Sequence, residues 1–211
     1  EDIPCVLLQM TLVAFSDIIQ IAREWNSDGL LKSFVLSNIH GLSPNFINGV
    51  KTVDYEETKQ LYLHILDAYE KHQDWVVLKI FLDECLAYWK DRPIIDAGQS
   101  VPMATCMPIN SKIYIDSQMQ IGICEKVADK YRIGNVKNGI DWKRANEIVE
   151  EYYHKRVERC KYCPAIRMCD TCLTAVEYSD EQWDILCHNE RVYAQIFMFL
   201  YCEMAERGLI K

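Results

Sequence analysis

The sequence predicts an α/β fold in two domains, the first built from βαβ units around a parallel sheet and the second α+β and rich in cysteine. Three observations lead to this prediction. Strand-like apolar runs alternate with amphipathic helices over residues 1–98. The pattern then changes to a hairpin with a polar turn, and most of the ten cysteines lie beyond this change. We therefore expect one domain over residues 1–98 and a second over residues 99–211.

The first domain opens with a strand, a helix and a second strand. Residues 3–12 (IPCVLLQMTL) form an apolar run that is typical of a buried strand, and residues 30–39 (LLKSFVLSNI) form another. Between them, Ser16 or Asp17 caps a helix, which Asp28-Gly29 ends. This order indicates a parallel pair of strands joined through a helix.

Two further helices complete the first domain. Asp54 is a good N-cap for a helix that runs through His72. The next segment fits either a strand or a helix, but its apolar side chains keep a helical stripe from Val76 to Trp89. We therefore expect a helix there.

Polar residues stand at the carboxyl ends of both predicted strands. Gln9 and Thr11 end the first strand, while Asn38 and His40 end the second. Active sites of barrel-like α/β proteins lie at these strand ends. We expect a functional role for Asn38 or His40, although polar residues that cap a loop would give the same pattern.

The second domain begins with a predicted hairpin. Residues 112–124 alternate between apolar and polar around the turn Asp116-Ser117-Gln118. A loop that contains Ile133-Gly134-Asn135 leads to a helix over residues 141–157, and a final helix spans residues 180–207. The cysteine-rich segment lies between these two helices.

Charge and composition exclude some classes of protein. The formal net charge of −8 argues against a nucleic-acid-binding protein, which usually needs a basic face. No apolar run is long enough to cross a membrane as a helix, and no export leader is visible. A disulfide framework suits short secreted chains that cannot build a core, whereas half of the residues here are hydrophobic. We therefore expect a cytoplasmic protein whose reduced thiols bind metal.

Five cysteines form a compact group in the sequence, with the spacing Cys160-x2-Cys163-x5-Cys169-x2-Cys172-x14-Cys187. The two Cys-x2-Cys pairs lie closer together than the ~15–20 residues that separate the pairs of a zinc ribbon. Compact runs of this kind are typical of iron–sulfur clusters. With Cys106 and Cys124 the set has seven members, more than one tetrahedral zinc needs. A zinc-stabilised, non-enzymatic protein-binding module remains the alternative.

The other cysteines and the nearby cations have different expected roles. Three cysteines lie within apolar stripes and are expected in the core: Cys5, Cys85 and Cys202. Five cations crowd the cysteine-rich run of an otherwise acidic chain: Lys155, Arg156, Arg159, Lys161 and Arg167. Cations in such a place stabilise thiolates and raise the reduction potential of a cluster. The cations from Lys155 to Arg159 would be explained about equally well as the solvated basic end of a helix, where positive charge is favoured by the helix dipole.

The order of the cysteines resembles the SPASM domain, which is appended to radical S-adenosylmethionine enzymes that modify peptides. The pattern of that family reads C-x9-15-G-x4-C, gap, C-x2-C-x5-C-x3-C, gap, C. The resemblance covers about residues 100–190 and all seven cysteines of the set. Two positions depart from the family pattern. Met119 stands where the family usually has Gly, and the spacer before Cys172 has two residues instead of three.

The resemblance implies two auxiliary 4Fe–4S clusters. It assigns one cluster to Cys160, Cys163, Cys169 and Cys187, and the other to Cys106, Cys124 and Cys172. Three ligands would leave one iron of the second cluster open to solvent, to a side chain other than cysteine or to a substrate thiolate. Zinc is expected to occupy the same thiolates in aerobic preparations.

The resemblance also implies partners and a wider context. Residues 1–98 look like the last βα units of a partial TIM-like barrel, whose N-terminal remainder would be a partner of this chain. Contact of Asn38 or His40 with a cofactor is likewise implied by the resemblance. Maturases of this type install thioether-type crosslinks in cysteine-rich ribosomal precursor peptides and take electrons from a donor such as flavodoxin or ferredoxin. No Cys-x3-Cys-x2-Cys occurs in the sequence. S-adenosylmethionine would therefore bind only in the complete enzyme, and we expect this chain by itself to be inactive.

Overall fold

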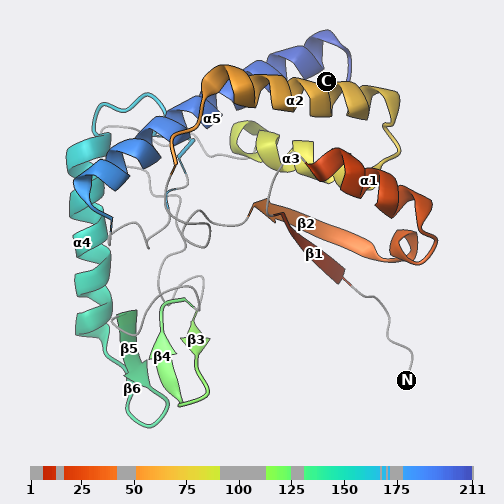
Figure 1. The fold of residues 1–211 in the computed structure, drawn as a ribbon. Helices are drawn as coiled ribbons and strands as arrows, with labels where there is room; N and C mark the ends of the chain where they lie inside the picture. Colours follow the sequence, from red (N-terminus) through yellow and green to blue (C-terminus); the bar gives the residue numbers. More distant parts are fainter. Residues whose placement is uncertain are drawn as a thin grey trace. The chain divides into compact units, whose positions relative to one another are not determined.

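The structure is a computed structural model that describes residues 7–12, 17–41, 51–90, 113–124, 131–166, 168–169, 171 and 178–210. The fold is mixed α/β, as predicted (Figure 1). The chain divides into two compact units, one of residues 1–93 with 191–211 and the other of residues 94–190. The sequence-based division differs in that it places residues 191–211 with the cysteine-rich domain. Each unit is described below by itself.

A parallel strand pair forms the sheet of the first unit. Strand β1 (Leu7–Leu12) pairs in parallel with β2 (Val35–Gly41), and α1 (Ile18–Ser27) lies between them in the chain. The predicted βαβ order is therefore confirmed. One parallel pair is described, so the TIM-like partial barrel stays a prediction.

The second predicted strand begins later than the sequence indicates. Residues Leu31–Ser33 form a 3-10 helix, η2, instead of the first part of the strand. The carboxylate of Asp28 accepts hydrogen bonds from the backbone N–H groups of Leu30 (2.8 Å) and Leu31 (3.0 Å). These bonds curl the chain into a turn, which delays the extended conformation until Val35.

Helices α2 (Tyr55–Lys71) and α3 (Val76–Lys90) follow as predicted. Asp54 is the N-cap of α2, and its carboxylate accepts a hydrogen bond of 2.8 Å from the backbone N–H of Glu57. Helix α3 packs on β2, and α1 packs against α3 (Figure 1). The fully buried side chains of Leu78, Leu82 and Leu86 come from the helical stripe that predicted α3.

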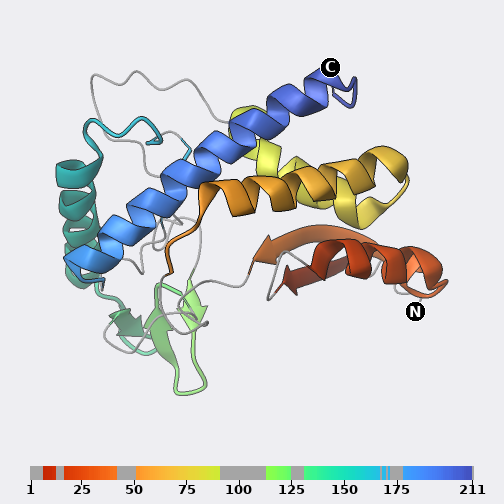
Figure 2. The ribbon, with the colours of Figure 1, turned by 45° about the horizontal axis from the view of Figure 1, so that its top comes forward.

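The C-terminal part of helix α5 (Asp180–Glu206) completes the core of the first unit. One stripe of this part is buried in that core: Val192, Ile196, Leu200 and Met204. Just beyond the helix, the Arg207 guanidinium binds the carboxylates of Asp67 (2.7 Å) and Glu70 (2.9 Å) on α2, which runs beside it (Figure 2). This stripe and these ion pairs explain why residues 191–211 belong to the first unit.

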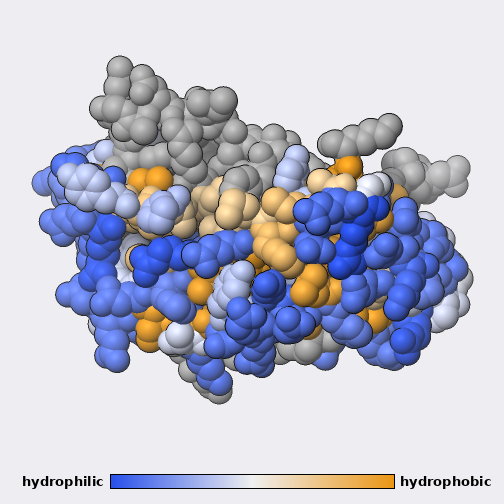
Figure 3. Space-filling view, turned by 90° about the horizontal axis from the view of Figure 1, so that it is seen from above, coloured by the Kyte–Doolittle hydropathy of each residue, from blue (hydrophilic) through white to orange (hydrophobic). Residues whose placement is uncertain are grey.

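Two cysteines expected in the core have different environments. Cys85 on α3 is buried, as predicted, whereas Cys202 on α5 is exposed. The prediction for Cys202 is wrong because the buried stripe of α5 runs through Leu200 and Met204 and leaves Cys202 on another side of the helix. Met198 and Tyr201 on α5 are also exposed, and hydrophobic side chains appear among the mostly hydrophilic ones in Figure 3. Cys5 lies outside the described residues.

An antiparallel sheet opens the second unit. Strands β3 (Tyr114–Ile115), β4 (Gln120–Gly122), β5 (Arg132–Asn135) and β6 (Gly139–Ile140) are hydrogen-bonded in sequence order. The predicted hairpin is confirmed by the antiparallel pairing of β3 with β4. The loop predicted around Ile133-Gly134-Asn135 is wrong, because these residues belong to a strand.

The β3–β4 turn contains an unusual residue. Met119 has φ 61°, in the left-handed region that favours glycine. The carboxylate of Asp116 accepts hydrogen bonds from the backbone N–H groups of Gln118 (2.8 Å) and Gln120 (2.9 Å) and so fixes the turn on either side of Met119. The methionine therefore adopts a conformation that a glycine would adopt without strain.

Helix α4 (Trp142–Cys160) packs on this sheet. Asp141 is its N-cap and accepts a hydrogen bond of 3.0 Å from the backbone N–H of Arg144. The core of the second unit contains Ile133 from β5, Tyr152 from α4 and Trp183 from α5. Helix α4 extends three residues beyond the predicted end and finishes at Cys160, the first cysteine of the compact run.

Candidate metal centre

Two ion pairs join the last turn of α4 to the first turn of α5. The Arg159 guanidinium binds Asp180 Oδ1 and Asp184 Oδ1, each at 2.6 Å, and lies 5.9 Å from the Trp183 ring centroid. The two aspartate side chains are 92% and 74% exposed, so each pair contributes only ~0.2–1 kcal/mol. Their main consequence is geometric, because they fix which residues of the two helices face each other.

This arrangement brings cysteines from two distant segments near one another. Cys160 follows Arg159 at the end of α4, and Cys187 lies about one turn after Asp184 on α5. Cys163 is turned back towards the helix end, since its backbone N–H donates a hydrogen bond of 3.0 Å to the Cys160 carbonyl. The thiols of Cys187 and Cys163 both act electrostatically on that of Cys160. The tertiary structure therefore brings Cys163 and Cys187 within electrostatic range of Cys160.

Cys169 is held in the loop after α4. Its backbone N–H donates a hydrogen bond of 2.9 Å to the Ala165 carbonyl, and its Sγ lies 2.8 Å from Thr171 Oγ1. Both Cys169 and Thr171 are buried. Each cysteine in the described part of the chain carries a thiol and takes part in no disulfide.

Burial raises the pKa of two of these thiols. For Cys160, Arg156 lowers the pKa, but burial together with the thiols of Cys187 and Cys163 leaves it above its ordinary value. For Cys169, burial and the Glu190 carboxylate raise the pKa to about 12, against the lowering effects of Thr171 and Arg156. Both thiols are therefore protonated at neutral pH in the metal-free protein, and a metal that binds them displaces protons.

A fully buried arginine lies beside these cysteines. Arg156, one turn before Cys160 on α4, donates hydrogen bonds to the Tyr152 hydroxyl (3.0 Å) and to the Cys169 carbonyl (3.4 Å). Tyr152 Oη in turn donates a hydrogen bond of 2.5 Å to the Thr171 carbonyl. Of the other predicted cations, Lys161 is exposed and Lys155 is half-buried. Arg167 lies outside the described residues.

The remaining predicted ligands are placed only in part. Cys124, at the end of the hairpin, packs against the same core of the second unit as Cys187. Cys106 and Cys172 lie outside the described residues. Within the part of the chain that is described, no three His, Cys, Asp or Glu side chains converge closely enough to hold a metal ion.

The strand ends of the first unit bring together the predicted cofactor-contacting residues. Gln9 is paired with Asn38, and Thr11 with His40, across the parallel β1–β2 ladder. Asn38 Oδ1 is inaccessible to solvent and has no hydrogen-bond partner among the described residues. A buried acceptor of this kind is usually satisfied by an ordered water or a ligand.

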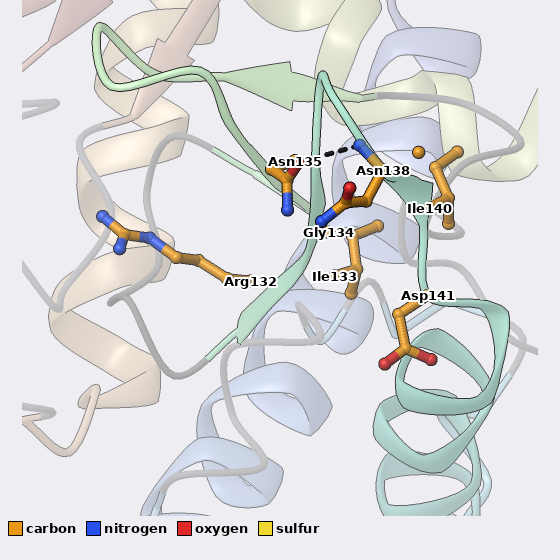
Figure 4. Close-up of a pocket in the computed structure, with 8 residues that line it drawn as sticks. Arg132, Ile133, Gly134, Asn135, Asn138, Ile140 and Asp141 are labelled. Atoms are coloured by element: carbon orange, nitrogen blue, oxygen red, sulfur yellow. Dashed lines mark hydrogen bonds between the residues drawn. The ribbon is translucent and has the colours of Figure 1, made fainter.

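A pocket of about 280 Å³ lies at the β5–β6 hairpin. In Figure 4 the Arg132 side chain points away from Asn135 and Asn138, and it forms an ion pair of 3.1 Å with Asp116. Asn135 Oδ1 accepts a hydrogen bond of 2.9 Å from the backbone N–H of Asn138, which closes the turn. The polar groups of this pocket therefore stabilise the hairpin, and no cysteine lines it.

Two residues of the centre, Tyr152 and Thr171, were not singled out from the sequence, and Arg156 was predicted only as one of five cations near the cysteines. Tyr152 and Thr171 carry no motif, and Arg156 reads as one member of a basic run. The sequence contains one signal that could have identified Tyr152 and Arg156. These two residues and Cys160 follow one another at intervals of four, so they share one face of a helix.

Comparisons of the chain with protein-family models, with curated proteins and with solved structures gave no match. Among the helices that are described, none is long and apolar enough to span a lipid bilayer.

Proposed function

We propose that residues 94–190 form an iron–sulfur module in which Cys160, Cys163, Cys169 and Cys187 hold a cluster. We further propose that this module belongs to a peptide-modifying radical S-adenosylmethionine enzyme of the SPASM type and supplies auxiliary clusters to it. The seven-cysteine pattern supports both steps, and the electrostatic effect of Cys163 and Cys187 on Cys160 adds support to the first.

One observation carries the proposal. Helices α4 and α5 are joined by the ion pairs of Arg159, and this junction lies directly beside Cys160 and Cys187. These cysteines are 27 positions apart in the chain, yet their thiols act on each other. Thiols from separate segments that lie near one another and beside a cation are suited to bind a metal as thiolates.

The donor set fits an iron–sulfur cluster. Clusters of this type are held by cysteine thiolates, and the second unit offers thiols at all four positions of the proposed site. When bound, such a cluster supplies one-electron transfer chemistry. The residues of this chain hold the thiolates, bury Cys160 and Cys169 from water, and place the Arg156 charge beside them.

Anaerobic reconstitution with iron and sulfide tests the proposal. One 4Fe–4S cluster gives about four irons per chain, and a second one at Cys106, Cys124 and Cys172 gives about eight. The protein should be brown and contain acid-labile sulfide. Zinc without iron from an anaerobic preparation would favour the zinc-stabilised binding module, and an absence of both metals would refute any metal site.

Matched cysteine variants test the ligand assignment. Cys163→Ala should lose the iron of one cluster, whereas Cys202→Ala should bind as much iron as the wild type because Cys202 is exposed on α5. Equal iron contents in the two variants would show that the assignment is wrong.

A cysteine-containing peptide tests the proposed substrate. If one iron of the second cluster is open, adding the peptide to the reconstituted protein should change the spectrum of that cluster through a thiolate bond. The serine analogue of the peptide should have no effect. Identical spectra with both peptides would refute thiolate binding while leaving the iron–sulfur module itself standing.

A further inference from the structure

Arg156 stands apart from the other cations of the cysteine-rich run. Its side chain is fully buried, whereas Arg159, three residues later, retains 25% exposure and binds two exposed aspartates. Arginine is rarely buried completely, because removing a guanidinium from water is costly unless hydrogen bonds and negative charge surround it. The buried position therefore needs a physical reason.

The guanidinium joins α4 to the cysteine loop, meaning the described residues 161–166, 168–169 and 171 that follow this helix. It donates hydrogen bonds to the Tyr152 hydroxyl on its own helix and to the Cys169 carbonyl in the loop. The ring of Tyr152 lies 6.0 Å from the guanidinium carbon. These contacts hold the guanidinium, and with it the positive charge, in one position.

From this position the charge acts on two proposed ligands at once. Arg156 interacts electrostatically with the thiols of both Cys160 and Cys169, which are nine residues apart in the chain. Arg159 also acts on Cys160, but its charge is balanced by Asp180 and Asp184. Glu190 acts on Cys169 with the opposite sign. Arg156 is thus the buried positive charge that faces both sulfurs.

We propose that Arg156 is the counter-charge of the thiolate site: its fixed positive charge stabilises the bound metal–thiolate centre, which is negatively charged, and raises the reduction potential of that centre. The proposal rests on the metal site proposed above and adds a positioning residue to it. The guanidinium remains protonated throughout the accessible pH range, so the charge is permanent. Reduction adds a negative charge to the centre, and a nearby buried cation favours that state.

Variants at position 156 separate charge from hydrogen bonding. Arg156→Met removes the charge together with the hydrogen bonds to Tyr152 and the Cys169 carbonyl, and Arg156→Gln removes the charge but keeps polar atoms that can donate. Arg156→Lys keeps the charge and loses the planar fork of donors. Arg144→Gln is the matched control, since it removes one positive charge from the same helix at an ion pair with Glu147, about three turns before the site.

The first readout is the midpoint potential of the reconstituted cluster in an anaerobic redox titration. Arg156→Met and Arg156→Gln should shift the potential to more negative values, while Arg156→Lys and Arg144→Gln should remain close to the wild type. A structural role of Arg156 would change the fraction of protein that carries a cluster and leave the potential of the assembled clusters unchanged. That result would overturn the proposal.

The second readout is Co²⁺ affinity, which needs no iron or sulfide. Loss of the charge should weaken Co²⁺ binding by about tenfold or more, as is usual when a neighbour of metal ligands is removed. Arg156→Lys should retain most of the affinity; if it loses as much as Arg156→Met, the hydrogen bonds matter and the charge does not. Wild-type protein that binds neither Co²⁺ nor iron would refute the metal site and this inference together. Wild-type binding with unchanged affinity and potential in Arg156→Met would refute this inference alone.

Discussion

The hydroxyl of Tyr152 on α4 donates a buried hydrogen bond of 2.5 Å to the backbone carbonyl of Thr171, 19 residues later in the chain. The same hydroxyl accepts a hydrogen bond from Arg156. Tyr152 therefore attaches the cysteine loop to α4 at Thr171, which is distant in sequence from the point where the loop leaves the helix. This contact holds the loop without a metal ion.

Tyr152→Phe should loosen the cysteine loop. The substitution leaves the Thr171 carbonyl and one Arg156 N–H without this partner, and an unsatisfied buried group costs about 1–3 kcal/mol. Amide hydrogen exchange should become faster at residues 168, 169 and 171 and stay unchanged in α2, which belongs to the first unit. Tyr153→Phe is the control, because the neighbouring Tyr153 is half-buried and has no described hydroxyl bond. Equal protection of the loop in both variants would contradict this role of Tyr152.

Gly134→Ala should disrupt the sheet of the second unit. Gly134 has φ +145°, and a Cβ at this position would lie 2.1 Å from the Gly139 carbonyl oxygen. Backbone atoms cannot move away without breaking the β5–β6 pair, so we expect a destabilisation of ~3 kcal/mol or more. Gly29→Ala is the control, since a Cβ there meets nothing within 4 Å. Thermal denaturation followed by circular dichroism measures both, and similar midpoints would contradict the prediction.

Asp116→Asn should remove a pH-dependent part of the hairpin's stability. Hydrogen bonds from the backbone of Gln120 and Gln118 and the Arg132 charge hold the pKa of Asp116 below its ordinary value of 3.8. A lowered pKa in the folded state stabilises that state fully above 3.8, and the stabilisation is lost as the pH falls through the lower folded-state value.

Hydrogen exchange of the β3–β4 amides between neutral and acidic pH measures this effect. The difference in protection between wild type and Asp116→Asn should be largest near neutral pH and should disappear in acid. The exposed Asp74, in the first unit, provides the control Asp74→Asn. A difference that persists unchanged into acid would show that the carboxylate charge does not stabilise the turn.

Alkylation should distinguish Cys202 from Cys85 in the native protein. Burial raises the pKa of the Cys85 thiol to about 12, and the side chain is inaccessible, whereas Cys202 is exposed on α5. Because only an accessible thiolate reacts, iodoacetamide at mildly alkaline pH should label Cys202 first and Cys85 only after the first unit opens. Mass spectrometry of proteolytic peptides gives both rates. Equal rates in native protein would mean that α3 does not bury its stripe.

Helix starts, helical stripes and tight turns depend on residues close together in the chain, so they can be predicted from the amino-acid sequence alone. Asp54 and Asp141 mark helix starts because an N-cap bonds to residues only a few positions later. The stripe of α3 and the polar turn at Asp116 are likewise contained within short windows. The parallel pairing of β1 with β2 also follows from the chain order, because a helix between two strands brings the second back beside the first. The spacing of the compact cysteines is also local, and the metal site that this spacing indicates stays a prediction.

Tertiary contacts, by contrast, determine which of several similar residues are buried. Arg156 and Arg159 stand in one basic run, yet the first is enclosed by Tyr152 and the cysteine loop and the second binds exposed aspartates. Gly134 lies in a strand because Ile140 pairs with it across the β5–β6 hairpin, and the periodicity of a short segment cannot predict this pairing. Helix α5 gives Cys187 to the second unit and its C-terminal stripe to the first, so that Cys202, on another side of this helix, is exposed. In each case the contacts that determine burial or strand pairing involve residues outside the short segment in question. Patterns within such a segment therefore cannot predict them.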